Sequence, residues 1–487
     1  MWEPSRPGNN AMSSSRPFPG IVTDPDVIAA YVSDASNTKG HAEALVRPER
    51  TEEVAAIVAH CQRRGIPLTV SASRTSTTAS SVPMGGWILS MERMARVRAI
   101  GAEHAVADAG VILAALQEQV RARGRMFPPD PTSRHSSTLG AAIACNASGA
   151  RSFRYGPTRA WIAGMTVVLP TGEILRIDDD TPTPTSWPEV AWSPPHPKNA
   201  AGYASSCQLL RLFVGHEGTL GVVTEATVRL TAAPVDTFSL WVWCADRPQA
   251  TLLADEARRR ARLSRLGAVS PSAIEYLDHH SVSMIRQRMA DVPDQARAAV
   301  LFEQEVHDEA AVDDHLQAWA DLLDTLDHVD TLVAHDAPAK RHLEALRHAV
   351  PATINERVTA LGIPKIGTDF AVTDAAMPSM FEAYERTPVP HVLFGHLGDN
   401  HLHLNMLPRD ANELVAARQW YEHLATLALK LGGTVSAEHG IGKLKRPWLA
   451  AMAGPKTLAT FVALKQHLDP NWVLCRGNLM KPPPSDP

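Results

Sequence analysis

The sequence predicts an α+β protein with more than one domain, and three observations carry this prediction. A helix followed by a short apolar strand fits residues 47–70, and a hairpin with a tight glycine turn fits 165–177. After residue 232, strands alternate with long helices. A chain of 487 residues has room for two or three domains of about 100–200 residues each.

The first predicted domain begins with a helix that has one apolar face, formed by Val54, Ile57, Val58 and Cys61. Gly65 ends this helix, and IPLTV at 66–70 follows as a strand. A second unit has a strand at 105–111 and a helix at 112–124. MTVVLPTGEILRI then forms the hairpin, turning at Thr171 and Gly172.

A change of pattern marks the second predicted domain. Thr181 to Pro197 is rich in Pro, Thr and Ser and is expected to be a surface loop within the first domain. Strands at 239–245 and 298–306 and a helix at 313–326 indicate a sheet with covering helices. The predicted limits are a disordered N-terminus at 1–19, domains at 20–232 and 233–435, and a segment at 436–487 that returns to the cleft between them.

The composition excludes several classes of protein. The net charge is −5, with 47 basic and 52 acidic residues, so no overall positive field indicates nucleic acid. The basic run from Ala257 to Arg265 could touch an anionic membrane, but such runs are more often solvated helix faces. Five scattered cysteines without CxxC pairs, no signal peptide and no run of about 18 apolar residues indicate a cytoplasmic protein, at most peripheral to a membrane.

Histidines gather in HVLFGHLGDNHLHLNM at 391–406. His401 and His403 share one side of a predicted strand, and His396 and His403 bracket a Gly-Asp turn. Glu438 and His439 are adjacent in GGTVSAEHGIGK. Two imidazoles and a carboxylate commonly bind a divalent catalytic metal, although hydrogen-bonded core histidines are the alternative. With a histidine base, such a site suits oxidation of an alcohol beside a carboxylate, and the hydride then needs a flavin or nicotinamide.

Several longer stretches carry a resemblance to a known family. They include FPPDPTS (127–133), STLGAAIACNASGARSFRYGPTRAWI (137–162), AGYASSCQLLRLFVGHEGTLGVVTEATVRL (201–230), GHLGDNHLHLN (395–405), SAEHGIGKLKR (436–446) and LDPNWVL (468–474). The chain resembles the FAD-linked oxidases of the vanillyl-alcohol oxidase superfamily, within them the D-lactate, glycolate and D-2-hydroxyglutarate dehydrogenases. The resemblance implies a PCMH-type FAD-binding domain of two α+β subdomains and a substrate (cap) domain with an antiparallel sheet and covering helices.

The resemblance also assigns roles to individual residues. It implies a divalent metal, zinc before manganese or iron, on His396, His403 and Glu438, with His439 as the base. Arg347, Lys365 and His401 would contact the substrate. The flavin would be noncovalent, because Thr75 stands at the usual attachment position. Its contacts would be Ser73, Arg74, Thr75, Ser76, Thr78, Pro131, Thr132, Ser133, Thr138, Leu139, Gly140, Asn146, Ser148, Gly218, Thr219, Gly221 and Val222.

Two departures from the family pattern bear on the reaction. The loop Ser71 to Val82 has no glycine where the family has a glycine-rich run, so some backbone strain is expected there, on the order of 1 kcal/mol per residue. We expect FAD to be retained, because the other flavin stretches are kept. The second departure is His401, which stands where the family usually has asparagine and so alters the acid that fits or joins the metal ligands.

The predicted activity is FAD-dependent oxidation of a D-2-hydroxy acid to the 2-oxo acid. Electrons would leave to a quinone, a cytochrome or an electron-transfer flavoprotein, and a homodimer is compatible with the family. The alternatives are a biosynthetic or non-redox flavoenzyme on the same fold, a flavin-free pseudoenzyme with the glycine-free loop as its main support, and, more remotely, a zinc hydrolase.

Overall fold

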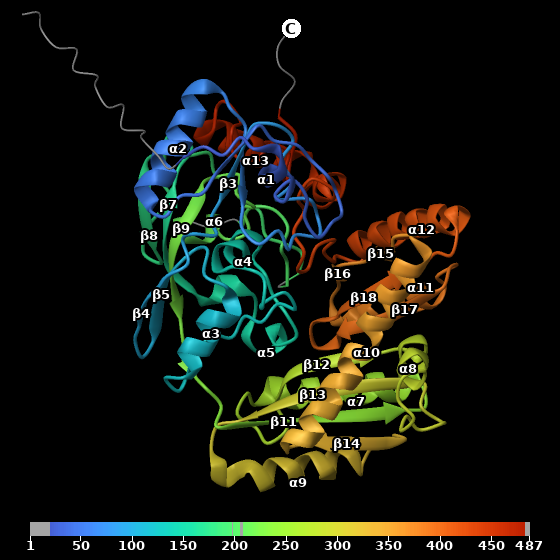
Figure 1. The fold of residues 1–487 in the computed structure, drawn as a ribbon. Helices are drawn as coiled ribbons and strands as arrows, with labels where there is room; N and C mark the ends of the chain where they lie inside the picture. Colours follow the sequence, from blue (N-terminus) through green and yellow to red (C-terminus); the bar gives the residue numbers. More distant parts are fainter. Residues whose placement is uncertain (1–19, 197, 205–207, 483–487) are drawn as a thin grey trace, which may run out of the picture.

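A computed structural model describes residues 20–196, 198–204 and 208–482, so the N-terminus predicted to be disordered, 1–19, lies outside the described part (Figure 1). The described residues form sheets of three, five and eight strands, and β6 (Arg125–Met126) pairs with β10 (Thr231–Ala232). Helices pack around these sheets, and the predicted α+β fold is confirmed.

The first sheet has three parallel strands in the order β1 (Ala44–Val46), β3 (Trp87–Ser90) and β2 (Leu68–Ser71). Helix α2 (Thr51–Arg64) buries the four side chains of its predicted apolar face. Gly65 ends it with a positive φ of 63°, which glycine adopts without strain. Strand β2 begins two residues later than predicted and leads directly into the loop 71–82.

The second sheet has five antiparallel strands in the order β4 (Val97–Ile100), β5 (His104–Asp108), β9 (Val222–Arg229), β7 (Ile162–Val168) and β8 (Ile174–Asp178). The predicted hairpin is β7–β8, and Gly172 turns with a φ of 88°. Two helices belong to this unit, α3 (Leu113–Arg121) and α4 (Leu139–Cys145). Helix α4 packs against β9 and β5. Its N-terminal turn faces the loop that follows β2, because residues of both line one cavity.

The third sheet is antiparallel and lies in the lower half of Figure 1. Its strands in order are β14 (Asp330–Ala334), β11 (Asp236–Cys244), β13 (Ala298–Val306), β12 (Pro271–Leu277), β17 (His391–His396), β18 (His401–Met406) and β15 (Ile366–Gly367), and β16 (Phe370–Ala371) also pairs with β18. Its main helices are α7 (Arg247–Leu263), α8 (His279–Arg286), α9 (Val312–Leu323), α10 (Ala337–Leu361), α11 (Met377–Glu385) and α12 (Ala411–Lys430). The predicted strand 298–306 has the bounds of β13. The predicted helix 313–326 corresponds to α9, which starts one residue and ends three residues earlier.

The chain then returns to the first sheet. Helix α13 (Arg446–Leu468) lies at the top of Figure 1, near α2. Beyond it, Leu68 N–H donates to the Val473 carbonyl at 2.8 Å, and Cys475 N–H donates to the Leu68 carbonyl at 2.9 Å. Residues 473–475 therefore run beside strand β2, far in sequence but next to it in space.

The segment Thr181 to Pro197 is only partly as predicted. It is irregular apart from one bridge between Pro182 and Gln208, but it is not a surface loop throughout, and Pro197 lies outside the described residues. Val190, Trp192 and His196 are buried, and the Trp192 ring packs against Phe461 with centroids 5.4 Å apart. These side chains follow no period, which is why the pattern of the sequence did not reveal their burial.

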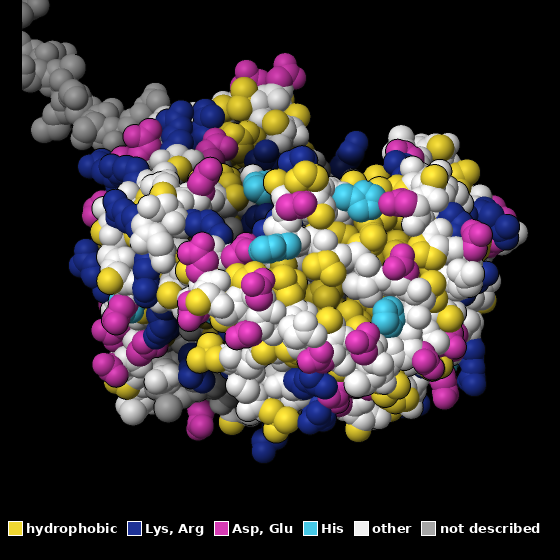
Figure 2. Space-filling model, turned by 90° about the horizontal axis from the view of Figure 1, so that it is seen from below, with side chains coloured by type: hydrophobic (Ala, Val, Ile, Leu, Met, Phe, Trp, Pro, Cys, Tyr) yellow, Lys and Arg dark blue, Asp and Glu magenta, His cyan; other side chains and the backbone are white. Residues whose placement is uncertain are grey.

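The basic run on α7 is neutralised by carboxylates. Arg258 is buried and pairs with Asp374, and Arg259 and Arg260 both pair with Glu256. These pairs favour the solvated-face interpretation over a membrane contact. On the face seen in Figure 2, basic and acidic side chains are interspersed. Among the described helices, none is both long and apolar enough to cross a membrane.

Candidate active site

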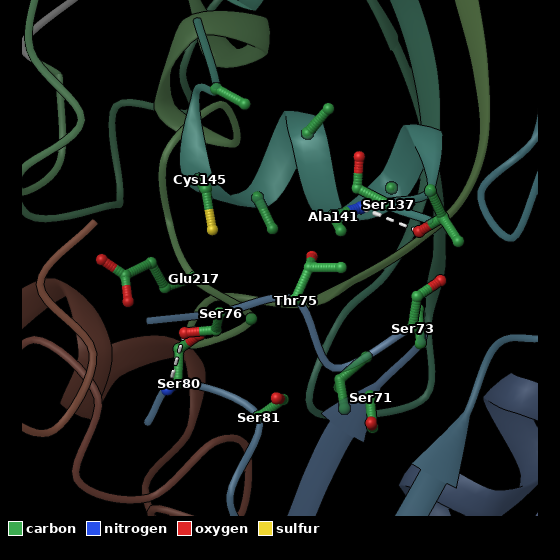
Figure 3. Close-up of a pocket in the computed structure, with 18 of the residues that line it drawn as sticks. Ser71, Ser73, Thr75, Ser76, Ser80, Ser81, Ser137, Ala141, Cys145 and Glu217 are labelled. Carbon is green, nitrogen blue, oxygen red and sulfur yellow. Dashed lines mark hydrogen bonds between the residues drawn. The ribbon is translucent and has the colours of Figure 1, made fainter. Parts of the chain in front are cut away.

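A cavity of about 380 Å³ lies between the loop that follows β2 and helix α4. Figure 3 shows Thr75 and Ser76 on the loop side and Ala141 and Cys145 on the helix side. A third wall comes from residues 216–223, which lead into β9. Glu438, His439 and Cys475 also line it, so the returning C-terminal segment completes the cavity.

Most residues predicted to contact FAD line this cavity. They are Ser73, Arg74, Thr75, Ser76, Pro131, Thr132, Ser133, Thr138, Gly140, Ser148, Gly218, Gly221 and Val222. Four others do not: Thr78, Leu139, Asn146 and Thr219. Leu139 is a core residue and Thr219 donates a hydrogen bond to the His216 carbonyl. Asn146 ends α4 with a φ of 48° and donates to the Asn199 carbonyl, while Thr78 donates to the His439 carbonyl.

The glycine-free loop keeps the backbone conformation that glycine usually provides. Arg74 has a φ of 58° and Ala79 a φ of 60°, both in the left-handed region. The Arg74 guanidinium lies over the Tyr31 ring, 4.6 Å from its centroid, and donates to the Ala72 carbonyl. The loop therefore curves as a cofactor-binding loop does, at the cost of two strained residues.

The cavity has polar groups that fit a flavin nucleotide. The hydroxyls of Ser71 and Ser137 are buried and have no hydrogen-bond partner within the described part of the chain, and both residues line the cavity. A buried hydroxyl without a partner costs roughly 1–3 kcal/mol, which a ligand's oxygen or nitrogen would offset. By contrast, Gly140 and Gly221 serve packing, because a Cβ there would lie 2.8 Å from the Ala109 Cβ and 2.6 Å from Val167 Cγ1.

Glu217 forms a buried link between two walls of the cavity. Its carboxylate accepts hydrogen bonds from the backbone N–H groups of Ile441 and Gly442, at 2.6 and 2.7 Å. Burial raises the pKa of Glu217 to about 7 despite these two bonds. It ties the segment before β9 to the C-terminal segment, where Gly442 passes so close to Thr78 that a Cβ would lie 2.1 Å from the Thr78 carbonyl oxygen.

The hairpin β17–β18 gathers the predicted histidines next to the cavity. His396, His401, His403 and Glu438 each offer one ligand atom, and these atoms lie within 4.8 Å of one another. His396 and His401 are directly paired across the hairpin, and His403 follows His401 by two positions on the same face. The structure therefore brings the three predicted metal ligands together and adds His401 to them.

Two charged residues of this cluster were missed by sequence reasoning. Lys198 is buried, and its ammonium lies 2.7 Å from Glu438 Oε1 and 3.3 Å from Asp399 Oδ2. Burial alone would raise the pKa of Glu438, but Lys198, His396 and His401 hold it well below its usual range. Asp369 is also buried and accepts hydrogen bonds from the backbone N–H groups of Glu438 and His439. Neither residue stands in a recognisable motif, because each reaches Glu438 only once the chain has folded.

His439 stands where the cavity meets the histidine cluster. It lines the cavity, and its ring stacks on His403 with centroids 5.6 Å apart and an angle of 20° between the planes. Its Nδ1 lies 3.5 Å from Asp369 Oδ2. Burial lowers the pKa of His439, which favours the neutral imidazole, the form that can accept a proton.

The predicted substrate residues take different positions. Lys365 donates to Asn405 Oδ1 at 2.7 Å, and Asn405 lies on the same face of β18 as His401 and His403. Arg347 on α10 lies 3.3 Å from Glu275 Oε2, and the other oxygen of Glu275 bonds His396 Nδ1 at 2.6 Å. Arg347 is thus linked to His396 of the cluster through Glu275, whereas Lys365 bonds Asn405 beside the cluster. His401, fully buried against Asp369, lies among the metal-ligand candidates.

Two family models match this chain. One, described as an FAD binding domain, matches residues 42–178. The other, described as the C-terminal domain of FAD linked oxidases, matches residues 255–479. The first match contains the loop after β2 and helix α4, and the second contains the histidine hairpin and Glu438.

Curated relatives cover nearly the whole chain. The glycolate oxidase subunit of Bacillus subtilis (strain 168) is 29% identical over 455 residues, which are 90% of this chain and 88% of the relative. A D-lactate dehydrogenase of Anaerostipes hadrus is 28% identical, covering 91% and 90%. A D-2-hydroxyglutarate dehydrogenase of Stutzerimonas stutzeri (strain A1501) is 28% identical, covering 94% and 96%. Among solved structures, an alkyldihydroxyacetonephosphate synthase superposes with a TM-score of 0.68 at 17% identity, covering 93% and 81%, which shows a shared fold.

Proposed function

We propose that this chain, which belongs to the FAD-linked oxidases and is a hydroxy-acid oxidoreductase, oxidises a D-2-hydroxy acid to the corresponding 2-oxo acid. D-lactate, D-2-hydroxyglutarate and glycolate are the acids to test, because the relatives are named for them. FAD would be bound without a covalent link in the cavity between the loop 71–82 and α4.

The position of His439 carries this proposal. A base for alcohol oxidation must reach the substrate hydroxyl while the carbon faces the hydride acceptor. His439 lines the flavin cavity and stacks on His403 of the histidine cluster, so it touches both sides of the site. Its lowered pKa suits a group that must be unprotonated at neutral pH.

The remaining roles follow from charge and position. FAD would supply the hydride acceptor when bound, and His396, His403 and Glu438 would hold a divalent ion, zinc before manganese or iron, that would polarise the substrate hydroxyl. The neutral His439 imidazole would accept the hydroxyl proton, and the Asp369 carboxylate, which accepts a hydrogen bond from the His439 backbone N–H, would hold this chain segment in place. Lys365 and Arg347 supply the cations for the substrate carboxylate, and each is oriented by a partner on the cluster side.

Several finer features belong to the same proposal. The proposed domains span residues 20–232 and 233–435, and residues 436–487 form the returning C-terminal segment. Electrons would leave the reduced flavin to a quinone, a cytochrome or an electron-transfer flavoprotein. The cytoplasm is the proposed location, with a peripheral membrane contact where the acceptor is a quinone, and a homodimer is the proposed assembly.

The test is anaerobic reduction of the purified protein by each acid, followed in the visible spectrum. We expect a flavin spectrum that bleaches with one of the three acids and recovers when an electron acceptor is added. His439→Gln should keep the flavin spectrum and slow the bleaching by about 10²–10⁴-fold, the usual contribution of a positioned base.

The control is His391→Asn on strand β17, whose Nδ1 faces the Val389 carbonyl outside the cluster. It should bleach like the native protein. A protein that holds FAD but makes product without any acceptor would indicate a non-redox flavoenzyme instead. A colourless protein that cannot take up FAD would contradict the proposal altogether.

A further inference from the structure

His401 differs from a substrate-binding residue in its surroundings. Its side chain is fully buried, and its Nδ1 lies 3.7 Å from Glu438 Oε1, the same oxygen that lies 3.3 Å from His396 Nε2. The His401 and His403 rings have centroids only 4.4 Å apart. His401 therefore points at the centre of the cluster, between the other candidate ligands.

Each of the three histidines has an oxygen atom near one ring nitrogen, although His401 Nε2 does not form a hydrogen bond of good geometry with it. His396 Nδ1 lies 2.6 Å from Glu275 Oε1, His401 Nε2 lies 3.0 Å from Asp369 Oδ1, and His403 Nδ1 lies 3.3 Å from the Thr368 carbonyl oxygen. An acceptor on one nitrogen places the N–H there and leaves the lone pair on the other, which is the usual arrangement of a metal-binding histidine. For His396 and His403 the free nitrogen is Nε2, whereas for His401 it is Nδ1.

The free nitrogen of His401 has no hydrogen-bond partner among the described residues. Both ring nitrogens of His401 are buried, and Nε2 likewise has no hydrogen-bond partner among these residues. An unsatisfied buried nitrogen costs roughly 1–3 kcal/mol, and a cation placed among His396, His403 and Glu438 would remove this cost.

We propose that His401 is a direct ligand of the divalent metal through Nδ1, so that the ion is held by three imidazoles and one carboxylate. This inference rests on the metal site of the proposed function, and it changes the number of protein ligands and the preferred ion. Four protein ligands fill the four positions of a tetrahedral zinc ion and leave none for a substrate oxygen. The site therefore suits an ion with five or six ligands, such as manganese or iron, which keeps positions open.

The experiment uses the full-length flavoprotein, stripped of metal and reloaded with Mn²⁺ or Zn²⁺. X-ray absorption at the metal edge counts the imidazoles around the ion, and competition with a chelator gives its dissociation constant. We expect three imidazoles in the native protein and two in His401→Asn. The dissociation constant should rise at least about 10-fold in this variant. Loss of a residue that only hydrogen-bonds a metal ligand already weakens binding by about 10-fold or more, and loss of a direct ligand should weaken it further.

His391→Asn, on the same hairpin but outside the cluster, should leave both readouts unchanged. Two imidazoles in the native protein, no bound metal, or a His401→Asn variant with native affinity would each overturn the inference. The imidazole count needs no variant, so misfolding of His401→Asn does not remove the test. None of these readouts depends on turnover. Three imidazoles around the ion in a protein that oxidises no hydroxy acid would therefore confirm His401 as a metal ligand and contradict only the proposed reaction.

Discussion

Ala79 is a buried residue with a positive φ, and it sits in the loop that frames the flavin cavity. A Cβ in this conformation costs about 1–2 kcal/mol, and a branched side chain costs more. We expect Ala79→Val to lower the free energy of unfolding by at least about 2 kcal/mol and to weaken FAD retention. Chemical denaturation and the flavin content of the purified protein measure these two effects.

Ala79→Gly is the matched control at the same position. Relief of the strained φ offsets the lost methyl group and the extra backbone entropy of glycine, so the stability should stay within about 1 kcal/mol of native. If valine and glycine destabilised equally, the loss would come from packing and not from the backbone conformation.

Glu217 should make stability depend on pH. Its ordinary pKa is 4.5, and burial raises it to about 7 in the folded protein. Between these values the folded chain holds a proton that the unfolded chain has released, so this stabilising contribution is complete below pH 4.5 and is lost as the pH rises through 7. Glu217→Gln cannot ionise, so its stability relative to native should rise by about 3 kcal/mol from pH 4 to pH 8.

Unfolding of both proteins at several pH values measures this difference. The loss of one carboxylate acceptor for Ile441 or Gly442 shifts the variant by a constant amount, so only the change with pH is diagnostic. Glu103→Gln, at an exposed position, is the control. A difference between Glu217→Gln and native that stays flat with pH would mean that folding does not raise the pKa of Glu217.

The sequence predicted the site residues that stand in motifs. His396, His403, Glu438 and His439 lie in glycine-punctuated stretches, and the structure brings them together. Lys198 and Asp369 could not be predicted, because a buried charge is recognised only from the partner it meets in space. The backbone strain expected in the glycine-free loop is found at Arg74 and Ala79, which both have a positive φ.

At the scale of elements, the segment 181–196 offers a direct test of its buried tryptophan. Trp192 packs on Phe461 of helix α13 and is only 8% exposed. Trp192→Ala should lower the stability by about 3 kcal/mol, as expected for a large core aromatic. Thermal unfolding measures it, and Glu189→Ala, exposed in the same segment, should change the stability by less than about 0.5 kcal/mol. Equal losses of stability in Trp192→Ala and Glu189→Ala would mean that the Trp192 side chain is not part of the core.

Elements with a clear period were predicted well. Helix α2 buries one face and ends at Gly65, and the hairpin β7–β8 turns at Gly172; both glycines have a positive φ. Segments without a hydrophobic period were predicted poorly, and the segment around Trp192 is the main example. Strand β2 starts late because Ile66 and Pro67 precede its first paired residue, Leu68.

At the scale of the whole molecule, ion pairs join the flavin-binding half to the third sheet. Arg151, just before helix α5 (Ser152–Tyr155), bonds Glu303 on β13 at 2.5 and 3.1 Å, and both side chains are largely buried. Glu303→Ala leaves the Arg151 guanidinium without its main partner. We expect a loss of about 2 kcal/mol, below the roughly 3–5 kcal/mol of a fully buried pair, and a separation of unfolding into two transitions.

Differential scanning calorimetry resolves the number of transitions. Glu309→Ala, exposed in the short helix at Glu309–Ala311, should unfold like the native protein. A single unchanged transition in Glu303→Ala would mean that other contacts couple the two halves.

The architecture was predictable because long motifs specify the family, while the way its parts meet was not. A sheet-and-helix pattern says that residues 233–435 form a unit, but it does not say that Arg151 meets Glu303. Nor does it say that residues 473–475 lie beside Leu68. Such contacts join residues hundreds of positions apart, and they follow from the packed fold alone.

That last contact orders events during synthesis. Glu438, His439 and Cys475 complete a cavity whose other walls are translated some hundreds of residues earlier. While the ribosome is still adding α12 and α13, strand β2 lacks its neighbour at residues 473–475 and the loop 71–82 lacks its backing. We therefore expect stable flavin binding only after residue 475 has emerged from the exit tunnel.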